Sequence, residues 1–208
     1  MTESPRYQRR KEDRPKEIAE AAFEVFAEKG YAATRVEEVA KRAGVSKGLT
    51  YLYFKTKEEL FKAVIRGVVV RRIDSLIENI DSTTLSPEAF LRGPMLEFMQ
   101  RIPGSRISVV LRLLMAEGHR HPDLLDYYYD NVVGRGLETL RRFLDRGVES
   151  GEFRRTAVND MPHLILAPMM LATIWKMLFT RRSLDTDKLI ATQMDLVLEH
   201  IRADGAAQ

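Results

Sequence analysis

The helical organisation of this chain is most visible in the segment Ala43-Gly44-Val45-Ser46-Lys47-Gly48. Gly44 can adopt the positive φ of a tight turn at no steric cost. Val45 brings an apolar side chain to the corner, and the hydroxyl of Ser46 is a good N-cap for the residues that follow. The segment therefore predicts two short helices joined by a turn, the second of which begins near Lys47.

Two helices are predicted upstream of this turn. Apolar residues at helical spacing within Ile18–Phe26 indicate a helix that starts near Lys16 and ends at Gly30. Thr34 and Glu37 have the spacing of a capping box, in which Thr34 is the N-cap of the next short helix and Glu37 its N3 residue. With the helix after Ser46, these make a three-helix unit at the N-terminus.

Downstream, helical patterns continue to the end of the chain. Thr56 and Glu59 form a second capping-box pattern, which opens a long helix reaching about Ile80. Ser86 followed by a proline and an acid predicts another helix start. Further apolar stripes occur near residues 107–115, 122–144, 164–179 and 187–201, and no alternating run is bounded by hairpin turns. The sequence predicts an all-α protein of about nine helices, with a larger helical bundle after the N-terminal unit.

Composition narrows the possible classes of protein. The 208 residues include no cysteine, which excludes disulfides, thiolate metal sites and cysteine nucleophiles and suits a reducing compartment. Residues 1–14 carry no apolar stretch, so no secretory signal is predicted. The longest uncharged run, Met161–Trp175, is shorter than the ~18–20 residues that span a bilayer. We expect a cytoplasmic protein with no membrane partner.

The positive charge of the chain is concentrated in its first third. Residues 1–62 hold 14 Lys and Arg against 11 Asp and Glu, whereas residues 63–208 hold 19 of each. The excess is densest in an N-terminal arm, residues 1–14, and just after it, where Glu12 and Asp13 are outnumbered by Arg6, Arg9, Arg10, Lys11, Arg14 and Lys16. Such an arm can follow phosphates, and it can equally be a solvated tail.

Three runs together, Gly30–Ala40, Ala43–Gly48 and Tyr51–Leu60, closely resemble the DNA-binding domain of TetR/AcrR-family repressors. The resemblance extends over about Ile18–Phe61. It implies a homodimeric bacterial regulator that binds a double-stranded DNA operator and usually releases it when a small-molecule effector enters the C-terminal domain. It also implies a DNA-binding domain at residues 15–62 and an effector-binding and dimerisation domain at 63–202. Independently of the resemblance, residues 203–208 are expected to form a flexible tail.

The residues expected to face DNA are small, polar or cationic, as base edges and phosphates require. They are Thr34, Arg35, Ser46, Lys47, Gly48, Thr50, Tyr51, Tyr53 and Lys57. Gly48 would let the helix approach the DNA closely. Leu49, Leu52 and Phe54 are interpreted as packing residues. The alternative for the two tyrosines is that they also pack rather than bind.

Methionine and aromatic residues after position 90 suit an adaptable pocket for an apolar or amphipathic ligand. The candidates are Met95, Phe98, Met99, Leu111, Met115, Tyr128, Met169, Met170 and Trp175, and the alternative is ordinary core packing. The two C-terminal helices are expected to form the dimer interface through Leu166, Met170, Leu189, Val197 and Ile201. Trp175 could belong to either group. Pro168 either kinks a helix or precedes its start.

No residue pattern indicates catalysis, a cofactor or a metal site. Glu117, His119, His121 and Asp123 alternate at a spacing of two, which places neighbours on opposite sides of a helix. Only Glu117 and His121 could share a face, and an inward Glu117 would favour a cationic effector. Two other classes of protein can also be all-α, namely a protein-binding helical adaptor and a small helical enzyme. The first does not explain the N-terminal cations, and the second lacks a nucleophile or acid–base set.

Overall fold

The computed structural model describes the backbone of residues 5–203 and the side chains of residues 13–203. The chain is 77% helical, with about ten helices when segments that follow one another without a break are counted as one, and no strand forms within this described part of the chain. The all-α prediction is therefore confirmed. The chain divides into two compact units. The first contains the residues up to Arg72 together with Val110–Tyr129, and the second contains Ile73–Val109 and the residues from Asp130 onward.

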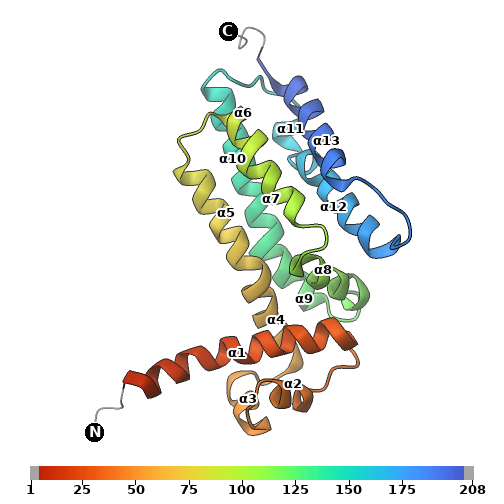
Figure 1. Ribbon diagram of the computed structural model, residues 1–208. Coiled ribbons are helices and arrows are strands. Elements are labelled where there is room, and N and C mark those ends of the chain that lie inside the picture. The colour runs from red at the N-terminus through yellow and green to blue at the C-terminus, as the bar shows by residue number, and fades with distance from the viewer. Residues whose placement is uncertain (1–4, 204–208) are drawn as a thin grey trace. The chain divides into compact units, whose positions relative to one another are not determined.

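The first unit contains the helix–turn–helix (Figure 1). Its elements are α1 (Pro5–Lys29), α2 (Val36–Arg42), α3 (Lys47–Tyr53), α4 (Lys57–Ile65), the π-helical segment η1 (Arg66–Val70), α9 (Pro122–Tyr128) and the greater part of α8 (Arg106–Glu117). Its core includes three aromatic rings. The Phe26 and Phe61 centroids lie 5.2 Å apart, and the Tyr31 ring contacts both. Apolar residues of α1 and α4 are thereby buried against each other.

Two boundaries differ from the sequence prediction. α1 begins at Pro5 rather than near Lys16, because the intervening Arg, Gln, Lys and Glu residues are good helix formers that carry no apolar stripe. The side chains of Arg6, Arg9, Arg10 and Lys11 lie outside the described residues, whereas Arg14 pairs with Glu17 at 2.8 Å and Lys16 with Asp13 at 3.6 Å. The N-cap of α2 is Arg35, not Thr34. The buried Thr34 hydroxyl donates to the carbonyl of Gly30 at 2.7 Å, so it closes the end of α1 instead.

Other helix ends agree with local capping chemistry. The hydroxyl of Ser46 accepts from Leu49 N at 3.1 Å, and the hydroxyl of Thr56 accepts from Glu59 N at 3.0 Å. Gly44 has a φ of +64°, as the turn requires. α4, η1 and the following α5 (Arg71–Ser82) succeed one another without a break, which confirms the predicted long helix. The predicted domain boundary at residue 62 falls inside α4.

The second unit is a bundle in which α12 and α13 pack side by side (Figure 1). Besides most of α5, its elements are α6 (Pro87–Phe90), η2 (Leu91–Met95), α7 (Leu96–Arg101), η3 (Tyr129–Val133), α10 (Gly134–Glu149), α11 (Ala157–Asp160), α12 (His163–Leu178) and α13 (Thr186–Ile201). Pro168 lies inside α12. Packing is tight where α10 meets Phe153, because a Cβ at Gly147 would lie 2.2 Å from that ring.

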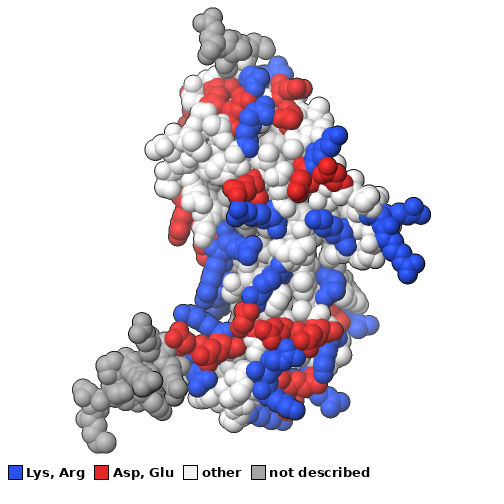
Figure 2. Space-filling view, viewed as in Figure 1, with Lys and Arg blue, Asp and Glu red and all other residues white. Residues whose placement is uncertain are grey.

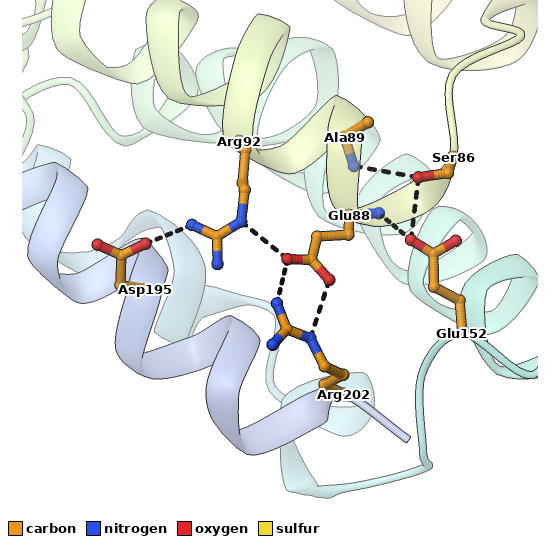
Figure 3. A network of polar contacts seen from close by, with 7 residues as sticks. All are labelled: Ser86, Glu88, Ala89, Arg92, Glu152, Asp195 and Arg202. Atoms are coloured by element: carbon orange, nitrogen blue, oxygen red, sulfur yellow. Dashed lines mark hydrogen bonds and ion pairs between the residues drawn. The ribbon is translucent and has the colours of Figure 1, made fainter. Parts of the chain in front are cut away.

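A set of charged residues, here called the C-terminal clamp, links the start of α6 to the end of α13 (Figure 3). The Arg202 guanidinium donates twice to Glu88, with Nε 3.0 Å from Oε2. Arg92 donates to Glu88 at 2.8 Å and also to Asp195. The carboxylate of Glu152 accepts from Glu88 N at 2.7 Å. The clamp therefore holds three separate parts of the second unit together.

Candidate nucleic-acid interface

The orientation of α3 is set by which of its residues are buried. Thr50 is fully buried and Phe54 is buried at the C-cap, so the side of α3 that carries these two residues faces inward. Ser46, Lys47 and Gly48 are exposed, and Tyr51 is half-buried. The outward side of α3 therefore presents one cation, one glycine and one phenol, which are groups that can meet phosphates and base edges.

Lys47 and Tyr51 form a pair on this outward side. The Lys47 ammonium lies 5.8 Å from the centroid of the Tyr51 ring and makes an ion pair with Glu37 of α2. The hydrogen bond with Glu37 raises the pKa of Lys47. Because both partners are exposed, water and salt screen their attraction, and a phosphate can replace Glu37.

The acidic side chains of α1 lie beside a helix of mixed charge. Figure 2 shows acidic side chains in a row along α1, with both basic and acidic side chains over α2. Arg42 of α2 donates to Glu24 at 2.9 Å and to Glu28 at 2.8 Å, both on α1. Arg35, before α2, is exposed. Arg42 is thus engaged in ion pairs between α1 and α2, whereas Arg35 is exposed and Lys47 pairs with Glu37.

Two threonines predicted to contact DNA are directed inward. Thr34 caps the end of α1, and the Thr50 hydroxyl donates to the carbonyl of Ser46 at 3.4 Å. Conversely, Leu52 was expected to pack but is 65% exposed. The reason is the 100° rotation per residue of an α-helix, which places Leu52 about 200° around the axis from the buried Thr50. These positions are corrections to the sequence-based interpretation.

Lys57 is engaged by the turn between α1 and α2. Its ammonium donates to the carbonyls of Tyr31, Ala32 and Thr34 at 2.8, 3.1 and 3.2 Å. It also lies 4.6 Å from the centroid of the Tyr31 ring. Burial lowers the pKa of Lys57, and the nearby Glu117 carboxylate opposes that effect. The predicted phosphate contact by Lys57 would require these bonds to be exchanged, so the role seen in the structure is to hold this turn.

The corner between α8 and α9 belongs to the same compact unit as the helix–turn–helix, which the sequence pattern did not indicate. Arg112 donates to the carbonyl of Ala27 at 3.0 Å, and the His121 ring meets the Tyr31 ring at a centroid distance of 4.9 Å. Arg66 donates to the Tyr127 hydroxyl at 3.3 Å. These contacts join residues far apart in sequence, so no local motif reveals them.

The acidic and histidine residues near this corner do not assemble into a metal site. Among the described residues, no group of three or more His, Asp or Glu side chains could hold an ion. Glu117 is half-buried, with its carboxylate 3.9 Å from the guanidinium of Arg120 and close enough to Lys57 and Tyr31 to affect their pKa values. Glu117 is therefore a neighbour of the Lys57 turn, with a cation already beside it.

Most residues predicted to line a ligand pocket in the second unit belong to its apolar core. Met95 and Met99 are fully buried there, and Phe98 and Met169 pack against the same cluster. Trp175 is half-buried and donates its indole N–H to the carbonyl of Arg182 at 3.2 Å. The core is thus rich in adaptable methionine side chains.

The remaining pocket candidates lie in the first unit or on the surface. Leu111 is buried, and burial raises the pKa of Tyr128 to about 12. Met115 is exposed on α8, and Met170 is exposed on α12. Leu111, Met115 and Tyr128 thus belong to the first unit, and the other six predicted pocket residues belong to the second.

The predicted dimer residues separate into two groups. Met170 is exposed, and Leu166 and Leu189 are half-buried. Val197 and Ile201 are buried in the core of their own subunit, so their selection as interface residues is corrected. The apolar stripe of α13 is explained by packing within the chain.

No helix in the described part of the chain combines the length and apolarity that crossing a membrane needs.

Comparison with known proteins gives matches to both parts of the chain. The family model described as bacterial regulatory proteins of the tetR family matches residues 18–64. The model described as the tetracyclin repressor-like C-terminal domain matches residues 88–197. The fatty acid metabolism regulator protein of Bacillus subtilis (strain 168) is 29% identical over 146 residues, which cover 69% of this chain and 74% of that protein.

Two solved structures share the fold over most of the chain. The complex of SmeT, a Stenotrophomonas maltophilia repressor, with triclosan has a TM-score of 0.77 and 21% identity, covering 94% of each chain. The transcriptional regulator FadR from Bacillus subtilis in complex with stearoyl-CoA has a TM-score of 0.69 and 23% identity, covering 89% of this chain and 98% of that chain.

Proposed function

The chain belongs to the TetR family of bacterial regulatory proteins and is a DNA-binding transcriptional regulator, and we propose that it acts as a ligand-released repressor. In this proposal α3 enters the major groove of a double-stranded operator. The observation that supports it best is the outward side of α3, where Lys47 and Gly48 are exposed while Thr50 is buried.

The proposed DNA contacts exclude the residues that are buried or that hold the backbone of a turn. Thr34 and Thr50 are left out because their side chains are buried, and Lys57 because its ammonium donates to three backbone carbonyls. Cations and hydroxyl groups are assigned to phosphates, and the side of α3 near Gly48 is assigned to base edges. The proposed set is Arg35, Ser46, Lys47, Gly48, Tyr51 and Tyr53.

The proposed dimer uses the exposed face of α12. Leu164, Leu171 and Leu178 recur every seven residues and are 45%, 50% and 66% exposed. This spacing places them on one side of the helix, and Met170 adds to that surface. A two-fold dimer places two recognition helices about 34–36 Å apart, or a multiple of it, which predicts a palindromic operator. Sedimentation at micromolar concentration tests this proposal, and a monomer would contradict it.

The proposed effector is an amphipathic acyl compound. A methionine-rich core in the second unit suits an apolar chain, since thioether side chains repack easily. The Bacillus subtilis relative is named for fatty acid metabolism, and a protein of the same fold was solved with stearoyl-CoA. Regulation requires that this ligand and the operator weaken each other's binding by the same factor.

Selection of binding sites from random DNA tests the regulator directly. The expected result is a palindromic sequence that the protein retards in a mobility shift at defined salt. Tyr51→Ala should weaken that complex by about 1–3 kcal/mol. Absence of any enriched sequence would contradict the function. Titration of acyl-CoA into the complex then tests the effector. If the protein binds acyl-CoA with the same affinity with and without operator, acyl-CoA does not release the protein from DNA.

A further inference from the structure

Leu52 is the apolar group on the outward side of α3. It is 65% exposed, and it follows Gly48 by four residues, so the two positions lie one above the other on the helix. A Cβ at Gly48 would meet only the Ser46 hydroxyl oxygen, at 4.0 Å. One strip of α3 is therefore open at Gly48 and carries an aliphatic side chain one turn later.

A single exposed leucine is common on protein surfaces and needs no explanation by itself. In α3, however, the outward direction of Leu52 is fixed by the residues that the helix buries. Burial of Thr50 and Phe54 prevents α3 from rotating to cover Leu52 within its own subunit. The proposed function places this same strip against DNA, so Leu52 must meet either a base edge or the sugar–phosphate backbone there.

We propose that Leu52 determines operator specificity by packing on the C5-methyl group of a thymine, an inference that rests on the proposed function. A leucine side chain has no donor or acceptor, and the thymine methyl is the apolar group that base pairs display in the major groove. Gly48 supports this contact, because the missing side chain lets the backbone approach the floor of the groove.

The contact favours thymine over cytosine at one position of each half-site. Cytosine offers an amino donor and no methyl at that edge, so the leucine would leave a donor without a partner. Removing the methyl alone should cost the transfer energy of about one buried CH₂ group, which is roughly a fourfold loss of affinity.

The test uses the selected operator with each thymine replaced in turn by deoxyuridine, which lacks only the methyl group. With the native protein, one symmetry-related thymine position should lose about fourfold in affinity per half-site. With Leu52→Ala, which changes an exposed position and keeps helix propensity, the same replacement should have no effect. Tyr51→Phe is the control, because it alters the neighbouring residue and should retain the deoxyuridine effect.

The outcomes are distinguishable. If no operator is selected, the proposed function fails. If an operator binds but no deoxyuridine position matters, or if the effect persists in Leu52→Ala, the assignment of Leu52 is wrong and the DNA-binding function stands. Circular dichroism of Leu52→Ala confirms that the variant is folded before its affinities are compared.

Discussion

Lys57→Met is expected to destabilise the first compact unit by about 2 kcal/mol. Methionine keeps the aliphatic stem but removes the ammonium group. That group donates hydrogen bonds to the backbone carbonyls of Tyr31, Ala32 and Thr34. Hydrogen bonds from charged groups contribute about 1.5–3 kcal/mol each when buried. Because this ammonium is only partly buried, we expect its three hydrogen bonds together to stabilise the fold by about as much as one buried hydrogen bond of this kind.

Urea unfolding measures this change. Trp175 lies in the second unit, so its fluorescence does not report on the first, and far-ultraviolet circular dichroism is the appropriate signal. A loss of 2 kcal/mol should lower the midpoint by about 1 M urea. Lys55→Met is the matched control, since Lys55 is exposed two residues away and its replacement should stay within about 0.5 kcal/mol. If the two variants unfold alike, the carbonyl turn does not depend on Lys57.

Three further results are expected. Lys47→Met should reduce the slope of log affinity against log salt by about one, and an unchanged slope in operator titrations would place Lys47 away from the phosphates. The hydrogen bond from the Arg202 guanidinium lowers the pKa of Glu88 in the folded protein below its ordinary value of 4.5. The stabilisation that the clamp provides is therefore present above pH 4.5, and it is lost as the pH falls through the lowered pKa of Glu88 in the folded state. Glu88→Gln should therefore flatten the loss of stability below about pH 4.5, and acid titrations that run parallel to the native protein would contradict this. Gly147→Ala should cost about 1–3 kcal/mol through overlap with an aromatic ring, whereas Gly136→Ala in the same helix should gain about 0.5–1 kcal/mol, and equal urea midpoints would refute the difference.

Helix starts were predictable wherever the cap is a local interaction. Ser46 and Thr56 bond to amides three residues ahead, and Gly44 supplies a backbone conformation that few residues tolerate. Thr34 shows the limit of this reasoning. Its hydroxyl has a second possible partner in the carbonyl of Gly30, and burial of the side chain selects that partner.

The rotation of α3 could not be read from residue type. Polarity suggested an outward Thr50 and an inward Leu52, but packing of the short helix reverses both. A helix of two turns has too few apolar residues to define a stripe, so tertiary contacts decide its orientation. The same ambiguity affected α13, where Val197 and Ile201 fit either a core or an interface until the bundle is assembled.

The discontinuous composition of the first unit has a consequence for recombining regulators. The chain enters the second unit after Arg72, returns at Val110 and leaves again after Tyr129. A hybrid made by joining one protein's first 72 residues to another's remainder would pair α1 and α4 with a foreign α8–α9 corner. Partners such as Ala27 for Arg112 and Arg66 for Tyr127 would then come from different parents. To transfer operator preference from one relative to another, the residues up to Arg72 and the segment Val110–Tyr129 should therefore be moved together.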